Sequence, residues 1–161
     1  MSRDLHAATF TTPSDREIKV TRIFDAPREL VYAAFTKPEI VRRWLLGPDG
    51  WSMPVCEMDV RPGGRYRWEW RHDGDETQFG IAGIFHEVVP LERLSASERF
   101  EGIAHPEARS TIALTDEDGG TRMTQTLLYA SKGDRDGVLQ TGMTGGMGAS
   151  YDRLAKTLAT S

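Results

Sequence analysis

The feature that most constrains the fold is a change of sequence period after Gly47. From residue 53 onward, apolar and polar side chains alternate for about eighty residues, which is typical of half-buried β-strands. Short turns rich in glycine, proline and aspartate separate the runs, so we expect antiparallel hairpins rather than parallel strands joined by helices. The predicted strands span residues 53–59, 64–71, 78–89, 93–100, 109–115 and 121–129.

Helical segments flank this run of strands. A first strand is expected at 16–24, and two short helices follow at 25–36 and 37–47, the first capped by Asp25. Residues 134–159 return to helical spacing and predict a long C-terminal helix whose apolar stripe covers one face of the sheet. The expected class is therefore α+β, with a curved antiparallel seven-stranded sheet.

Length and composition define one ordinary domain. The chain has 161 residues, so we expect a flexible leader over residues 1–15 and a single domain over residues 16–161. A net charge of -4 argues against nucleic acid and anionic membranes as partners. No segment has the length and apolarity of a signal peptide or a membrane span, which favours a cytoplasmic location.

Motifs for metals, nucleotides and hydrolytic nucleophiles are absent from the sequence. The only cysteine, Cys56, excludes an internal disulfide and a thiolate zinc cluster, and we expect it to be a buried free thiol. His6, His72, His86 and His105 lack the spacing of a metal site. We therefore expect no metal and no cofactor.

The segment GGRYRWEWR is the most informative candidate for binding. Tyr66, Trp68 and Trp70 alternate with charged residues and so share one face of a strand. Two interpretations are open: these aromatic rings form a core wall, or they line a pocket for an apolar ligand. Trp44 and Trp51 flank the turn that precedes the sheet, where they either pack in the core or gate such a pocket.

The C-terminal helix carries an unusual run of glycines. Gly142, Gly145, Gly146 and Gly148 each disfavour a helix by about 1 kcal/mol relative to alanine. Either the helix begins late, or these small residues allow a strand or a ligand to approach its backbone. Met143 and Met147 would line the same face.

Two polar residues are expected to point inward with apolar neighbours. Glu98 shares a strand face with Ala96 and Phe100, and Gln125 shares one with Met123 and Leu127. A buried glutamate has a raised pKa and can act as a general acid or base. The alternative is that Glu98 reaches water or an arginine.

Several segments together resemble a known family. DAPRELVY, RPGGRYRW and SYDRL are similar to sequences of the activator of heat shock protein 90 ATPase homologues, within the START-like or SRPBCC superfamily. The resemblance runs from about Arg16 to Leu158. It implies a bacterial protein with a helix-grip fold, in which the sheet grips the long C-terminal helix around a hydrophobic cavity. It also implies two short helices after the first strand.

The resemblance leaves three functions open. The leading hypothesis is binding of a small apolar or aromatic molecule, without catalysis, in a cavity between the sheet and the C-terminal helix. The second is a polyketide cyclase-like or dehydratase enzyme that uses Glu98, and the third is a co-regulator that binds a heat shock protein 90-type chaperone. A homodimer is conceivable. The residues predicted to bind the ligand are Trp44, Trp51, Tyr66, Trp68, Trp70, Phe79, Phe85, Gln125, Met143 and Met147.

Overall fold

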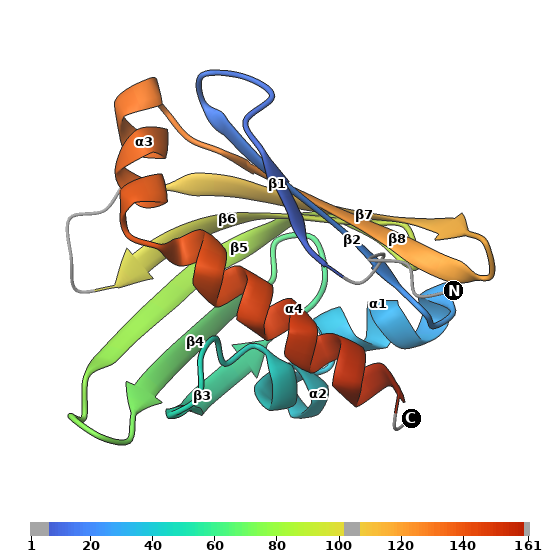
Figure 1. The fold of residues 1–161 in the computed structure, drawn as a ribbon, viewed down its shortest axis with the longest axis horizontal. Helices are drawn as coiled ribbons and strands as arrows, with labels where there is room; N and C mark the ends of the chain where they lie inside the picture. Colours follow the sequence, from blue (N-terminus) through green and yellow to red (C-terminus); the bar gives the residue numbers. More distant parts are fainter. Residues whose placement is uncertain (1–6, 102–106, 160–161) are drawn as a thin grey trace.

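The computed structural model describes residues 7–101 and 107–159 and confirms the α+β class (Figure 1). Its elements follow the expected order along the chain. They are β1 (Thr9–Thr11), β2 (Glu17–Phe24), α1 (Arg28–Thr36), α2 (Pro38–Trp44), β3 (Trp51–Met58), β4 (Arg65–His72), β5 (Gln78–Val89), β6 (Arg93–Glu101), β7 (Ala108–Glu117), β8 (Gly120–Leu128), α3 (Lys132–Gln140) and α4 (Met143–Ala159).

Within these residues the strands form one antiparallel sheet of eight strands, in the order β1-β2-β8-β7-β6-β5-β4-β3. The prediction of seven strands is wrong by one, because Thr9–Thr11 lies in the expected leader and pairs with β2. A strand of three residues is too short to show a period, and the open edge of β2 supplies its hydrogen bonds. β3–β5 run at a steep angle to β2, β7 and β8, so the sheet is strongly twisted (Figure 1).

The two short helices carry the chain from β2 to β3 at the opposite edge of the sheet. Pro27, rather than Asp25, takes the N-cap position of α1, and its carbonyl accepts hydrogen bonds from the backbone N–H groups of Leu30 and Val31. The prediction of Asp25 as the cap is therefore wrong. α2 begins at Pro38 as expected, where proline loses no helical hydrogen bond.

The expected C-terminal helix is two helices. Gly142 separates α3 from α4 with a φ of +78°, a left-handed conformation that glycine adopts without strain. The hydroxyl of Ser131 caps α3 by accepting a hydrogen bond from the backbone N–H of Asp134 at 3.0 Å. α4 crosses one face of the sheet diagonally, as Figure 1 shows.

Strand alternation and register decide which side chains face α4. The buried residues of β2 and β8, such as Val20, Phe24 and Met123, pack with Tyr151 and Leu154 of α4. We call this side of the sheet the inner face, and the opposite side the outer face.

A second part of the core lies between α2 and strands β3–β5. Cys56 belongs to it as the buried free thiol that was expected, and its Sγ donates a hydrogen bond to the carbonyl of Pro38 at 3.6 Å. Among the described helices, none combines the length and the apolarity needed to cross a membrane.

Candidate functional site

The inner face of β4 and β5 carries a continuous set of aromatic rings. Tyr66 lies 4.6 Å from Trp68 between ring centroids, and Trp70 stacks on Phe79 at 4.9 Å. Phe100 of β6 continues the set at 6.3 Å from Phe79. The register explains this arrangement, because Trp68 pairs with Ile81 and Trp70 pairs with Phe79 across two antiparallel strands.

Some of these rings are core and some keep accessible surface. Tyr66, Trp70 and Phe85 are buried, whereas Phe79 is 37% exposed and Trp68 is partly buried. The indole N–H of Trp68 is itself buried, and it has no hydrogen-bond acceptor within the described residues. We call this set of rings the aromatic wall. Part of it is packed in the core, and part of it keeps accessible surface.

The two other predicted tryptophans lie in different surroundings. Trp44 is only 2% exposed, packs between Phe35 and Tyr151, and donates its indole N–H to the carbonyl of Ala34 at 2.9 Å. Trp44 therefore presents almost no surface to a ligand. Trp51 is partly buried and lies edge-on to Phe79, with ring centroids 5.4 Å apart.

The ladder of paired residues between β5 and β6 is interrupted at one place, which we call the opening. The ladder pairs Ala82 with Arg99 and Phe85 with Ala96, and Gly83 and Ile84 between them have no paired residue in β6. Side chains replace the missing ladder bonds. The hydroxyl of Tyr66 donates to the carbonyl of Ser97 at 2.7 Å, and the backbone N–H of Ile84 donates to the hydroxyl of Ser97 at 3.1 Å.

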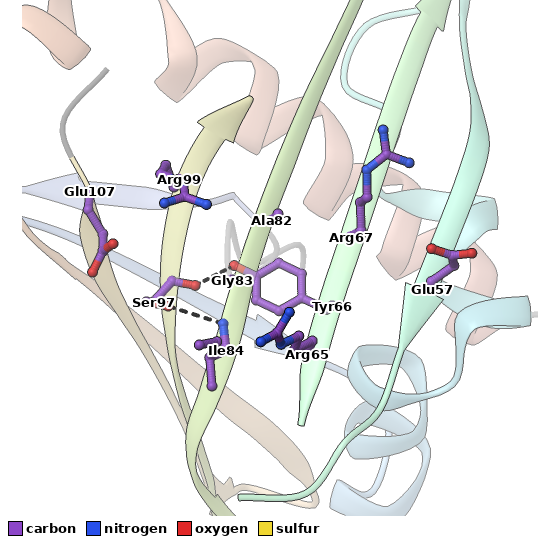
Figure 2. A pocket seen from close by; sticks show the side chains of 10 residues that line it. All are labelled: Glu57, Arg65, Tyr66, Arg67, Ala82, Gly83, Ile84, Ser97, Arg99 and Glu107. Carbon is purple, nitrogen blue, oxygen red and sulfur yellow. Dashed lines mark hydrogen bonds between the residues drawn. The ribbon is translucent and has the colours of Figure 1, made fainter. Parts of the chain in front are cut away.

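A glycine is required at this opening. A Cβ atom on Gly83 would lie 1.8 Å from the carbonyl oxygen of Ser97 and 2.8 Å from the ring of Tyr66. Figure 2 shows the phenol of Tyr66 beside Gly83, with its hydroxyl bonded to Ser97. Tyr66 thus closes the opening between the two strands.

A groove of about 470 Å³ lies over this opening on the outer face (Figure 2). Both negatively charged glutamates and positively charged arginines line this groove. The residues that line it are Glu57, Arg65, Tyr66, Arg67, Ala82, Gly83, Ile84, Ser97, Arg99 and Glu107. A second groove of about 270 Å³ adjoins it through Arg67 and includes Phe79. Tyr66 and Phe79 are thus the predicted binding residues that border these two outer grooves.

Glu98 faces inward, as the strand pattern predicted. Its neighbours on the inner face are small: Ala96 on the same strand and Ala108 directly opposite on β7. The side chain is partly buried, and burial raises the pKa of its carboxyl to about 7. Near neutral pH, Glu98 can therefore both give and accept a proton.

A line of hydrogen bonds leads from α4 toward Glu98. The hydroxyl of Tyr151 donates to the amide oxygen of Gln125, and the amide nitrogen of Gln125 donates to the hydroxyl of Ser110 at 3.0 Å. Ser110 pairs with Ala96, two residues before Glu98 on β6. Gln125 is therefore a buried, satisfied residue. Identifying Ser110 as its partner from sequence would have required the register of the hairpin from β7 to β8.

The glycines of α4 do not pack against a strand. α4 begins at Met143, so Gly145, Gly146 and Gly148 lie inside the helix, and a Cβ atom on each would meet nothing within 4 Å outside that helix. Met143 and Met147 are partly buried on this part of α4. The interpretation that these glycines admit a close strand is therefore wrong.

No group of three possible metal ligands occurs within residues 7–101 and 107–159. His6 and His105 lie outside the described residues. His72 is the last residue of β4, and its Nδ1 lies 3.0 Å from a carboxylate oxygen of Asp75.

Comparison with solved structures gives the same architecture. A Rhodobacter sphaeroides protein superposes with a TM-score of 0.90 at 28% identity, covering 96% of this chain and 99% of its own. A Chromobacterium violaceum protein has a TM-score of 0.80 at 27% identity, with 90% and 98% covered. A Mycobacterium smegmatis protein has a TM-score of 0.85 at 23% identity, with 94% and 96% covered. Among curated proteins, no sequence matches this chain significantly.

The sheet crossed by α4, with an aromatic inner face and an inward glutamate, defines a helix-grip protein of the START-like class. The family model described as "Activator of Hsp90 ATPase homolog 1-like protein" matches residues 25–159. The chain belongs to this family, as its sequence motifs indicated.

Proposed function

We propose that the protein binds a small apolar or aromatic molecule between the inner face of the sheet and α4. The observation that carries the proposal is accessible apolar surface on side chains that face inward. Trp68 keeps such surface on the sheet, as do Met143 and Met147 on α4, because all three are only partly buried. Apolar surface of this kind costs about 25 cal/mol per Å² while it faces water, and a ligand would remove that cost.

Two further observations support the same location. A Cβ atom on Gly146 or Gly148 would meet nothing within 4 Å outside α4, so side chains are not packed tightly against this part of the helix. The buried indole N–H of Trp68 lacks an acceptor among the described residues, and a bound molecule could supply one. Methionines suit such a wall because their flexible, polarizable side chains adapt to ligands of different shapes.

The test compares two tryptophan substitutions. Met147→Trp would enlarge the side chain that α4 places against the sheet, at the proposed site, and Ile84→Trp would fill the outer groove, where Ile84 is 39% exposed. A library of aromatic and aliphatic compounds is screened by thermal stabilisation of the intact chain. We expect hits that stabilise the wild type and Ile84→Trp but not Met147→Trp.

The opposite pattern would move the site to the outer groove and overturn the proposal. An absence of stabilisation by every compound would also contradict it. Circular dichroism of both variants establishes that each remains folded.

Glu98 favours a second candidate function, catalysis of a proton transfer. Its inward position among small residues and its raised pKa, about 7, suit a general base. Ring opening of 5-nitrobenzisoxazole tests for such a base, because removal of its ring C–H proton breaks the N–O bond and releases a coloured phenolate. A rate above background that is lost in Glu98→Gln would support catalysis, and an unchanged rate would oppose it.

A further inference from the structure

We propose that the inner-face site selects organic cations, so that its ligand is an apolar or aromatic amine whose ammonium group pairs with Glu98. This inference deepens the proposed function and rests on it. It concerns the polar end of the site, whereas the aromatic wall accounts for the apolar body of the ligand.

The first argument is the lack of a counter-ion for Glu98. Within the described residues, the Glu98 carboxyl makes no hydrogen bond and no ion pair, whereas Glu101 on the same strand is paired with Arg67 at 3.0 Å. The hydroxyl of Ser110, on the neighbouring strand, accepts a hydrogen bond from Gln125, and within the described residues it donates none to Glu98. A carboxylate withdrawn from water gains most from a partner of opposite charge.

The second argument is the identity of the titratable groups that the charge of Glu98 influences. They are three phenols, from three elements: Tyr66 of β4, Tyr129 after β8 and Tyr151 of α4. Burial raises the pKa of each of these tyrosines above its ordinary value, and the negative charge of Glu98 raises it further. All three are therefore neutral from pH 5 to pH 9. None of them can compensate a negative charge on Glu98.

The third argument is the ring chemistry around the carboxyl. Phe100 follows Glu98 by two residues on the same face, and Tyr66 lies against both Trp68 and Phe85, with centroid distances of 4.6 and 5.4 Å. Aromatic faces attract cations by about 0.5–2 kcal/mol each, and they repel anions. A carboxylate beside aromatic faces therefore favours an ammonium group over a neutral or anionic head group of the same size.

Space for a head group follows from the residues next to Glu98. Ala96 and Ala108 flank it on β6 and β7. Larger side chains at these positions would cover the carboxyl. Because they are small, they do not cover the Glu98 side chain completely, and the residue is partly rather than fully buried.

The experiment uses three probes with one apolar body and different head groups: 1-naphthylmethylamine, 1-naphthalenemethanol and 1-naphthoate. Each is titrated by calorimetry into the intact wild-type chain, into Glu98→Gln and into Glu57→Gln. Glu57 is the matched control, because its carboxyl is exposed and lines the outer groove. Titrations at about pH 8 and about pH 5.5 compare the site with Glu98 ionised and the site with Glu98 protonated.

We expect the amine to bind wild type and Glu57→Gln at least tenfold more tightly than the alcohol at pH 8. Glu98→Gln should bind both with similar affinity, and its retained affinity for the alcohol shows that it is folded. Lowering the pH to 5.5 should weaken amine binding to wild type about tenfold or more, because Glu98 becomes protonated, and should leave Glu98→Gln unchanged.

Other outcomes separate the two proposals. Equal binding of all three probes, or tightest binding of the naphthoate, would overturn the cation selectivity and leave the apolar site in place. Loss of amine binding in Glu57→Gln but not in Glu98→Gln would also overturn it, and would move the cation to the outer groove. Binding of none of the probes to wild type would contradict the proposed function as well.

Discussion

Single residues determine whether the strands around the site can approach one another. Gly83 is the clearest case, since the carbonyl oxygen of Ser97 occupies the place of its missing Cβ, 1.8 Å away. A methyl group at this position would first meet the Ser97 carbonyl and the Tyr66 ring. These two groups are joined by the hydrogen bond from the Tyr66 hydroxyl to the Ser97 carbonyl. This position therefore tolerates no side chain without movement of β5 or β6.

Two glycine-to-alanine substitutions test this directly. Gly83→Ala should lower the free energy of unfolding by about 2 kcal/mol or more, because the strands must separate. Gly145→Ala should raise it by about 0.5–1 kcal/mol, because alanine favours a helix and its Cβ meets nothing within 4 Å outside α4. Urea unfolding, monitored by fluorescence, measures the free energy of unfolding of both variants. Equal effects of the two substitutions would contradict the packing described at Gly83.

Glu98 makes stability depend on pH in a definite direction. Burial raises its pKa to about 7 in the folded protein, so folding favours the protonated carboxyl and disfavours the carboxylate. The unfolded chain ionises Glu98 at lower pH. Stability from this group is complete below the unfolded pKa and is lost as pH rises through about 7.

Glu98→Gln removes this dependence, because the amide stays neutral. The variant should exceed wild type in free energy of unfolding by about 2 kcal/mol at pH 8, and the difference should shrink as pH falls toward 5. Chemical denaturation across this pH range gives the comparison. A difference that is constant with pH would show that Glu98 is not withdrawn from water.

At the scale of elements, polar contacts hold α4 at residues 150–153, in the middle of the helix. Ser150 accepts a hydrogen bond from the backbone N–H of Gly47 at 2.8 Å, and Arg153 donates to the carbonyl of Gly47 at 3.0 Å. Arg22 of β2 pairs with Asp152 at 2.7 Å. The N-terminal half carries the glycines and methionines beside the proposed site, so the anchoring of the helix and the proposed binding involve different turns.

Among these contacts, the ion pair between Arg22 of β2 and Asp152 of α4 gives the clearest test. Arg22 is buried whereas Asp152 is exposed, so Asp152→Ala leaves a buried guanidinium without its carboxylate. We expect the free energy of unfolding to fall by about 2–4 kcal/mol. Asp116→Ala is the control, since Asp116 pairs with the more accessible Arg28 and should cost less than about 1 kcal/mol. Similar losses in the two variants would contradict this ranking.

At the scale of the whole molecule, the strongly twisted sheet and the crossing helix create two environments. The inner face carries aromatic rings and the carboxyl of Glu98, which has no partner in the part of the chain that the structure describes, and the outer face carries the charged residues of β4, such as Arg65 and Arg67. Alternation along a single strand separates them, since neighbouring side chains point to opposite faces. The proposed apolar site and the charged groove thus lie on opposite sides of the same strands.

Much of this arrangement could be predicted from the sequence. The period of side chains along each strand places Tyr66, Trp68, Glu98 and Gln125 on the inner face, and the register confirms this. The packing of each ring could not be predicted, because burial of Trp44 and accessibility of Phe79 depend on what other elements place above them. The alternation of residues along a strand predicts the face of the sheet to which a side chain points, but it does not predict which residues that side chain contacts.

The sequence by itself determined the α+β class, the position of nearly every strand and the inward direction of Glu98, because these depend on residues close together in the chain. Tertiary structure alone decided the pairing of β1 with β2, the opening that Tyr66 closes, and the influence of the charge of Glu98 on three buried phenols. Each of these joins segments distant in sequence, and their approach is set by the twist of the sheet and the path of α4 across it.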